Sequence, residues 1–274
     1  MRRAGIAPLA AMLGLIAACA PALREPPPVA DLGRAPARSP IETPRASEVD
    51  RVLREADTSY ARRPDAAAVG RALDLYLAAA RADEARIEGL LGAAEASAWL
   101  IEHEPDGDRR AALATEAVQA CQWCQRRAPA SIDCKYRLAL ALGLQARERR
   151  STGVDALPRI ISLLEEVVAE APRLDDGGPH RVLALLYLRA PGWPTGPGDP
   201  EIALEHARKA DEFAPGNPEN LLALGEALAA AGSPEPARLA YTRAGELAKA
   251  LAESGNPDAR EWAEAASRAL RALR

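Results

Sequence analysis

Residues 217–251 carry the pattern that most limits how this chain can fold. Two segments with apolar residues at helical spacing flank the turn Gly232-Ser233-Pro234. Leucines and a glycine mark the first segment, and small residues with one tyrosine mark the second: Leu221, Leu224, Gly225 and Leu228, then Ala237, Tyr241 and Ala244. Small residues let two antiparallel helices approach closely while larger side chains fill the gap. The pattern therefore predicts a tightly packed helix pair.

The same spacing resembles a tetratricopeptide repeat. Gly225, Ala237 and Ala244 match the eighth, twentieth and twenty-seventh positions of that repeat, and Tyr241 matches its aromatic twenty-fourth position. Lys249 stands where the family has a closing proline. The resemblance implies a solenoid, in which each helix pair buries one face against its neighbours and leaves a concave face for partners.

Matching patterns recur upstream, and the chain is rich in alanine and leucine, which favour helices. In one further pair, Gly92 is the small residue of the first helix. The second helices of three pairs have the same spacing of residues: Ala72, Tyr76 and Ala79; Ala117, Cys121, Cys124 and Pro129; Ala203, Ala207, Ala210 and Pro215. Residues 257–273 are rich in arginine and glutamate, as a capping helix requires. We therefore predict an all-α fold for residues 47–274: an antiparallel, tetratricopeptide-like solenoid of about five helix pairs plus a C-terminal capping helix.

The first residues have the order of a secretory signal, with Met1-Arg2-Arg3 followed by a short apolar stretch. The sequence Ile16-Ala17-Ala18-Cys19 resembles a lipobox, which implies cleavage of residues 1–18 and a lipid on the Cys19 sulfur. The alternative is an ordinary signal peptide with a chance cysteine. Because Ala20 is not the aspartate that retains enteric lipoproteins in the inner membrane, we expect an outer-membrane lipoprotein that faces the periplasm.

Residues 19–46 follow as a proline-rich stretch with hardly any apolar periodicity. Such a composition predicts an extended, solvated spacer. At the rise of a polyproline helix, it would hold the folded part on the order of 80 Å from the lipid. We therefore expect residues 19–46 to act as a tether.

Three further cysteines, Cys121, Cys124 and Cys134, would lie in an oxidising compartment, where thiols usually pair. Cys121 and Cys124 share one helical face, and Cys134 begins the next helix, so either could bridge to Cys134. Free packed thiols are the alternative, and a redox or metal site is a more distant one. A zinc site would need a fourth ligand, and no histidine pair lies nearby.

The block from residue 175 to residue 200 departs from a generic tetratricopeptide repeat. It contains Asp175-Asp176-Gly177-Gly178-Pro179-His180, then Pro191-Gly192-Trp193-Pro194 and Gly198-Asp199-Pro200. This block resembles the T-component lipoproteins associated with tripartite ATP-independent periplasmic (TRAP) transporters, over roughly residues 66–251, although residues 133–158 match only loosely. The resemblance implies a periplasmic accessory that meets a solute-binding protein and handles a small apolar ligand. Related eukaryotic microtubule-associated proteins share a similar loop. The loop therefore indicates a shared fold as much as a shared function.

His180, Tyr187 and Trp193 are the candidate ligand-loop residues of this block. His180 either lines a pocket or, as is more usual, is a polar residue at a helix start. Trp193 lies between Gly192 and Pro194, where its indole either plugs the groove between helices or faces a ligand. We expect the plug.

Composition and motifs exclude several function classes. The net charge of −4 gives no electrostatic footprint for nucleic acid. The sequence contains no nucleophile elbow, phosphate loop or metalloprotease helix, so we predict no enzyme, no catalytic residues, no cofactor and no metal. The sequence favours a lipid-anchored scaffold that binds another envelope protein or a peptide, as a transporter accessory. The alternatives are an adaptor for outer-membrane, secretion or motility machinery and, more distantly, a cysteine-based redox or metal protein.

Overall fold

A computed structural model of the chain describes residues 25–33 and 41–273; the predicted signal peptide and Cys19 lie outside these residues. The described residues contain eleven α-helices and no strand beyond one isolated bridge. The helices are α1 (Val49–Tyr60), α2 (Ala66–Ala82), α3 (Glu88–His103), α4 (Gly107–Arg127), α5 (Ile132–Glu148), α6 (Gly153–Glu170), α7 (Gly178–Arg189), α8 (Pro200–Phe213), α9 (Pro218–Ala230), α10 (Pro234–Glu253) and α11 (Ala259–Ala272). None of them is long and apolar enough to cross a membrane.

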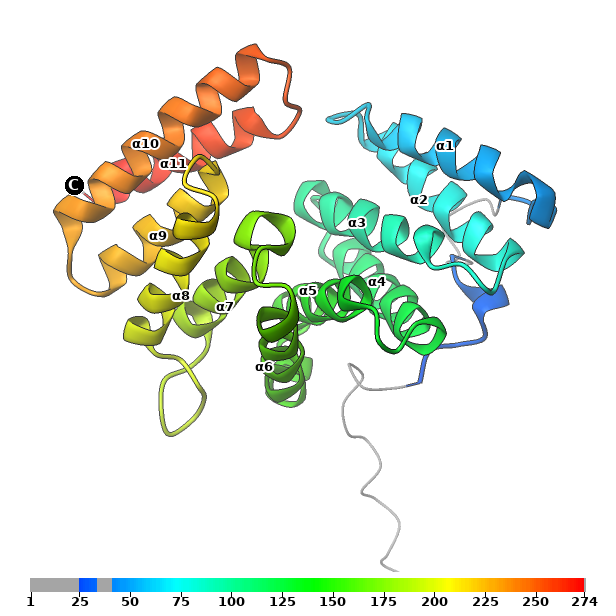
Figure 1. The fold of residues 1–274 in the computed structure, drawn as a ribbon, viewed down its shortest axis with the longest axis horizontal. Coiled ribbons are helices and arrows are strands. Elements are labelled where there is room, and N and C mark those ends of the chain that lie inside the picture. The colour runs from blue at the N-terminus through cyan, green and yellow to red at the C-terminus, as the bar shows by residue number, and fades with distance from the viewer. Residues whose placement is uncertain (1–24, 34–40, 274) are drawn as a thin grey trace, which may run out of the picture.

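Consecutive helices pack as antiparallel pairs, from α1 with α2 to α9 with α10, and α11 packs on α10 (Figure 1). Side chains at the starts of five helices cap the free backbone amides there: Asp65, Asp106, Ser131, Asp199 and Asn217. These caps fix where each helix begins. The predicted all-α solenoid of five pairs and a C-terminal helix is confirmed.

Glycines make two of the helix contacts close. A Cβ atom added to Gly225 on α9 would overlap the ring of Tyr241 on α10, and a Cβ added to Gly92 on α3 would overlap the ring of Tyr76 on α2. Both tyrosine rings are buried. The tyrosine therefore occupies the space that the missing side chain leaves, as the repeat pattern predicted for residues 217–251.

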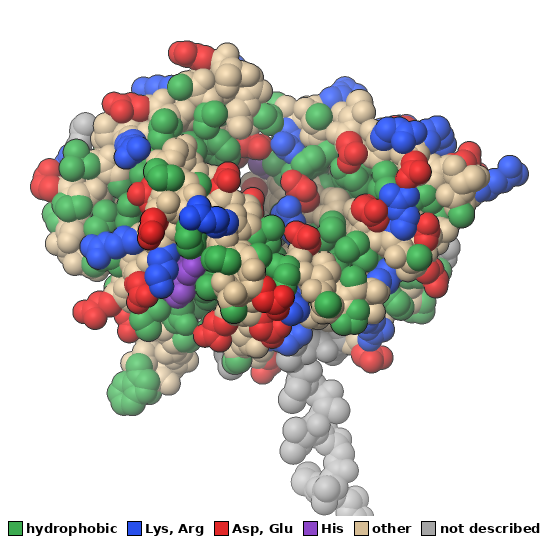
Figure 2. All heavy atoms as spheres, in the orientation of Figure 1, with side chains coloured by type: hydrophobic (Ala, Val, Ile, Leu, Met, Phe, Trp, Pro, Cys, Tyr) green, Lys and Arg blue, Asp and Glu red, His purple; other side chains and the backbone are tan. Residues whose placement is uncertain are grey.

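The solenoid curves until side chains of its first two helix pairs reach α11 and the turn before it (Figure 1). Arg63, in the turn between α1 and α2, lies 3.3 Å from the Asp258 carboxylate before α11. His103, at the end of α3, pairs with Glu261 of α11 and stacks on Trp99, with 3.7 Å between the ring centroids. Figure 2 shows the molecule hollowed between these two ends. The C-terminal helix therefore closes a ring as well as capping the last repeat.

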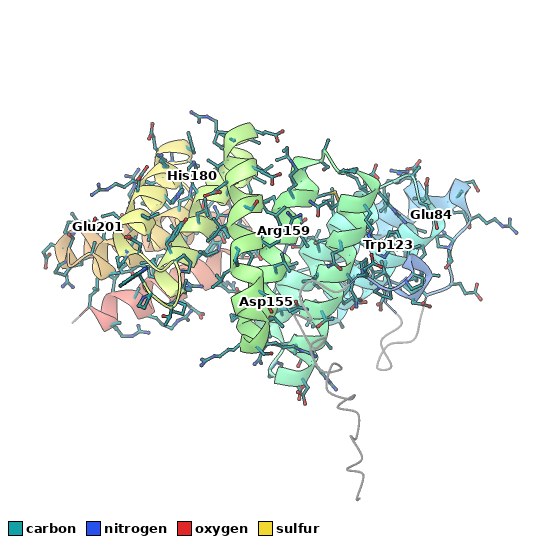
Figure 3. All side chains as sticks on the ribbon, turned by 90° about the horizontal axis from the view of Figure 1, so that it is seen from below. Glu84, Trp123, Asp155, Arg159, His180 and Glu201 are labelled. Atoms are coloured by element: carbon teal, nitrogen blue, oxygen red, sulfur yellow. A yellow bond between two sulfur atoms is a disulfide. The ribbon has the colours of Figure 1, made fainter. Side chains whose placement is uncertain are left out.

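Part of the proline-rich stretch packs on the repeats, so the expectation of a solvated spacer is wrong for residues 25–33. Leu32 is 1% exposed, and its carbonyl accepts a 2.6 Å hydrogen bond from Arg81. The carbonyl of Pro27 accepts a 2.8 Å bond from the Trp123 indole, which lies beside this segment in Figure 3. Prolines suit this role because an extended backbone has free carbonyls for side-chain donors.

The glycine contact gives a direct test of the packing. We expect Gly225→Ala to destabilise the protein by about 1–3 kcal/mol, or roughly 3–10 °C in the unfolding midpoint, because the added methyl group must displace the Tyr241 ring. Thermal unfolding followed by circular dichroism measures the change. Gly143→Ala is the control, since Gly143 also lies within a helix but has no atom within 4 Å of the added Cβ. Equal effects of the two substitutions would contradict the packing.

The ring closure predicts a pH dependence. Burial alone would lower the pKa of His103, but hydrogen bonds to the Trp99 carbonyl and to Glu261, together with the charges of Glu261 and Glu102, raise it. Protonated His103 therefore stabilises the folded protein fully below pH 6.5, the ordinary pKa of histidine. This stabilisation is lost as the pH rises through the higher pKa that His103 has in the fold.

The expected loss of unfolding temperature between pH 6 and pH 8.5 is small, roughly 1–3 °C, because the pair is partly exposed. His103→Gln should remove this pH-dependent part. The pKa values of the other two histidines, His180 and His206, are lowered, so these side chains titrate at lower pH and not in the direction of His103. An unchanged pH profile in His103→Gln would contradict the assignment.

Candidate binding surface

The segment before α7 has an unusual backbone. Asp175 and Asp176 both have positive φ angles, of 51° and 55°, and Gly177 continues the left-handed turn with a φ of 82°. Such conformations cost a non-glycine residue of order 1 kcal/mol or more and persist only where surrounding contacts hold them. The turn directs the Asp175 carboxylate to the Tyr136 hydroxyl, which donates a 2.7 Å hydrogen bond to it.

Arg181 on α7 is the centre of this network. Its side chain is 10% exposed and donates to Asp175 at 3.0 Å and to the Asn220 amide oxygen at 2.8 Å. Glu219 lies 3.5 Å from the same guanidinium. Asn220 in turn donates to the backbone carbonyls of Asp176 and Ala210. A buried arginine needs such partners, so the network fixes the turn, α7 and α9 relative to one another.

Charged groups from distant repeats converge on the interior of the ring. Burial raises the pKa of Tyr60, and the charges acting on it come from Glu95, Arg63, Asp258 and Arg137. Arg137 of α5 lies 3.6 Å from Glu95 of α3. The hollow in Figure 2 is lined by acidic and basic side chains accordingly. The inner surface is therefore polar and carries both signs of charge.

Glu219 belongs to the same interior. Burial raises the pKa of its carboxyl group, Arg181 opposes that shift, and Asp175, Asp258 and Asp176 add to it. Burial is the largest cause of the shift, and Arg181 is the largest of the charge effects. Glu219 therefore adds a partly buried carboxyl group to the α9 side of the interior.

His180 and Tyr187 are brought together through His206, a residue that the sequence did not single out. His180 is 3% exposed, and its Nδ1 lies 2.8 Å from Nδ1 of His206 on α8. Tyr187 stacks on His206, and Phe213 lies 5.5 Å from His180 between ring centroids. Burial, together with the charge of His206, lowers the pKa of His180 to about 4. The cluster is neutral at pH 7 and packs α7 against α8.

Trp193 does not join this cluster, so the expectation that it plugs the groove between helices is wrong. The side chain is 90% exposed at the tip of the loop between α7 and α8. A bridge between Gly192 and Gly198 and a 2.8 Å hydrogen bond from the Gly198 amide to the Pro191 carbonyl close the loop. The closed loop projects away from the helices at the lower left of Figure 1. Its own backbone bonds hold the indole out of the groove.

Two of the three remaining cysteines form a disulfide, and the third is a buried free thiol. Cys124 of α4 and Cys134 of α5 form a disulfide with 5.4 Å between their Cα atoms. Cys121 is a free thiol without exposed surface, and burial raises its pKa to about 12. In the described part of the chain, no group of three or more histidine, cysteine or acidic side chains could hold a metal ion. The bridge joins the second helix pair to the third.

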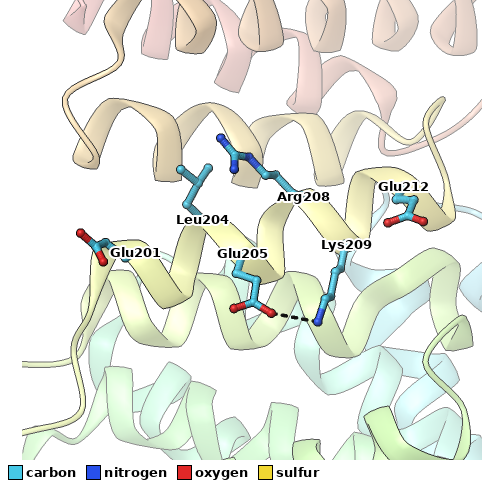
Figure 4. A pocket seen from close by; sticks show the side chains of 6 residues that line it. All are labelled: Glu201, Leu204, Glu205, Arg208, Lys209 and Glu212. Atoms are coloured by element: carbon cyan, nitrogen blue, oxygen red, sulfur yellow. Dashed lines mark hydrogen bonds and ion pairs between the residues drawn. The ribbon is translucent and has the colours of Figure 1, made fainter.

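A hollow on the surface of α8 is lined by side chains of this one helix: Glu201, Leu204, Glu205, Arg208, Lys209 and Glu212 (Figure 4). Glu205 and Lys209 form an ion pair of 2.9 Å one turn apart. Alternating charges on one exposed helix face are typical of a solvated surface. We therefore place the candidate site in the ring interior and not here.

The cysteine positions predict a specific reactivity. The oxidised, folded protein starting at Cys19 should expose one reactive thiol, that of Cys19, to a maleimide reagent. Unfolding without reduction should add Cys121 alone, because burial and a raised pKa protect it in the fold. Mass spectrometry of the digested protein should recover Cys124 linked to Cys134. A Cys121→Ser variant controls for the second thiol, and labelling of Cys124 or Cys134 without reduction would contradict the bridge.

In sequence, no family model and no curated protein matches the chain. In structure, it is similar to TTC0263, a thermophilic TPR protein of Thermus thermophilus, with a TM-score of 0.58 and 20% identity over 79% of this chain and 98% of that one. Two crystal structures of MamA align with TM-scores of 0.46 and 0.43 at 18% and 19% identity, over 72% and 77% of this chain and 96% and 97% of theirs. The similarity to TTC0263 establishes a tetratricopeptide-like fold for the helical part of the chain.

Proposed function

We propose that this protein is a lipid-anchored scaffold of the cell envelope that binds a protein partner through the interior of its ring. The observation that carries the proposal is the mixed-charge inner surface, to which separate helix pairs contribute Arg63, Glu95, Arg137, Glu219 and Asp258. Tetratricopeptide-like solenoids present such a surface to other proteins.

The inner charges suit a polypeptide better than an apolar ligand. The side chains of Arg63, Arg137 and Asp258 are 15%, 27% and 29% exposed, so their charges are partly withdrawn from water. Partial desolvation strengthens hydrogen bonds to an incoming backbone or side chain. A small apolar ligand would exclude water from these groups without offering them hydrogen bonds, which costs free energy. We therefore favour a protein or peptide over the apolar solute that the transporter resemblance implied.

Two features support a place in the envelope. The lipobox at residues 16–19 supplies the anchor, with the periplasmic face of the outer membrane as the proposed location. The chain has a disulfide between Cys124 and Cys134, and disulfides persist in secreted and periplasmic proteins but are rare in the cytosol. Export and disulfide formation are consistent with each other.

Crosslinking in living cells tests the binding surface. A photoreactive amino acid in place of Glu95, whose side chain is 46% exposed in the interior, should form an adduct with one envelope protein. The same group in place of Leu239, which is 73% exposed on α10, should not. Arg137→Glu should reduce the adduct at position 95 because it reverses one inner charge. Equal adducts from positions 95 and 239 would exclude the interior as the binding surface.

The identity of the captured protein separates the two forms of the proposal. A solute-binding protein or a permease would identify a transporter accessory, and a secretion or motility component would identify an assembly adaptor. Palmitate labelling of the same cells tests the anchor. The label should be lost in Cys19→Ala, and unchanged labelling would remove the lipid from Cys19.

A further inference from the structure

The loop of residues 191–198 presents a tryptophan that no other part of the described chain covers. Trp193 is the most exposed large apolar side chain of the described residues, and its neighbours Pro191, Gly192, Pro194 and Thr195 are exposed with it. No charged residue occurs from residue 190 to residue 198. The Thr195 hydroxyl donates to the Gly192 carbonyl at 2.9 Å, and the Asp199 amide donates to the Tyr187 carbonyl at 2.9 Å. The backbone is therefore held in shape before any contact is made.

We propose that this loop is a membrane contact, in which the Trp193 indole inserts at the interface of the bilayer to which Cys19 is anchored. The inference rests on the anchor of the proposed function. A tryptophan has an apolar body and one N–H donor, which is why such side chains concentrate at the level of the lipid headgroups. A loop without charge can follow it there at little desolvation cost.

The packed segment 25–33 brings the ring close to the lipid. Its first residue, Glu25, pairs with Arg126 of α4 at 3.2 Å, and Pro27 is held by Trp123. Cys19 precedes Glu25 by six residues. A chain of six residues spans at most about 20 Å when fully extended. The repeats are therefore kept near the bilayer surface, and not at the distance that a free spacer of residues 19–46 would allow.

The loop and the packed segment lie on the same side of the molecule. Figure 1 shows the segment 25–33, in blue, leaving the repeats toward the lower edge, and the loop between α7 and α8 projecting from the lower edge of the other half. The view from that side, in Figure 3, shows Trp123 beside the segment. A lipid surface reached by the anchor at one half of the ring can meet the loop at the other.

The size of the apolar surface favours lipid over a protein at this loop. A stable protein interface buries on the order of 1,000 Å² or more and surrounds its central aromatic residue with further contacts. Trp193 stands alone at a projecting tip, with only glycine, proline and threonine beside it. Interfacial insertion needs no such surrounding patch, because the lipids adapt to the side chain.

Vesicles with quenching lipids test the contact. The oxidised protein starting at Cys19 is coupled through that thiol to a maleimide lipid in phosphatidylethanolamine and phosphatidylglycerol vesicles, since Cys121 is buried and the other two cysteines are bridged. The fluorescence of the protein minus that of Trp193→Phe isolates the Trp193 signal. We expect this signal to shift to shorter wavelength on coupling and to lose intensity when the acyl chains carry bromine.

A second variant supplies the matched control. Leu239→Trp in the Trp193→Phe background places an exposed indole on α10, and its fluorescence should be the same with and without bromine. A Trp193 signal that bromine leaves unchanged would overturn the proposal. So would an unquenched Trp193 whose replacement by alanine removes the adduct at position 95, because the loop would then contact the protein partner. Chemical coupling replaces lipidation by the cell, so quenching of Trp193 and loss of the palmitate label are independent results.

Discussion

The contact of a glycine with a tyrosine ring sets the geometry on which the rest of this molecule depends. At Gly225 with Tyr241, and again at Gly92 with Tyr76, a missing side chain lets an aromatic ring lie directly on the backbone of the neighbouring helix. In a solenoid, the angle between successive pairs accumulates along the chain, so small rotations become overall curvature. This curvature brings Arg63 of the first pair to Asp258, in the turn before α11. The ring and its charged interior are consequences of packing.

The sequence predicts this packing because the information is local. Small residues recur in four of the five helix pairs, and capping residues such as Asp65 and Asn217 stand next to the helices they begin. The position of residues 25–33 could not be predicted in this way. Their partners are Trp123 and Arg81, which are 96 and 49 residues distant from Pro27 and Leu32. A proline-rich composition indicates an extended backbone and does not indicate which side chains will bind its carbonyls.

The candidate surface shows the same division. The unusual sequence beginning at Asp175 coincides with the left-handed turn before α7, because such a turn favours aspartate and glycine. The hydrogen-bond network around this turn is completed by Tyr136, Arg181 and Asn220, which lie on three different helices. No regular spacing in the sequence indicates that these three residues meet. His206 was missed for the same reason, since only the packing of α7 on α8 brings it to His180. The position of Trp193 was wrongly predicted because the hydrogen-bonded loop points its indole away from the helices, and composition does not specify where a loop points.

Ion pairs complete the ring without determining its shape. A partly exposed pair is worth about 0–1 kcal/mol, and both Arg63 with Asp258 and His103 with Glu261 retain contact with water. Overpacking one glycine contact costs more than losing either pair. The curvature therefore persists when the pairs break, and the charges at the junction can exchange partners at low cost. A surface whose charges are already close together but weakly paired is well suited to admit the charges of a polypeptide.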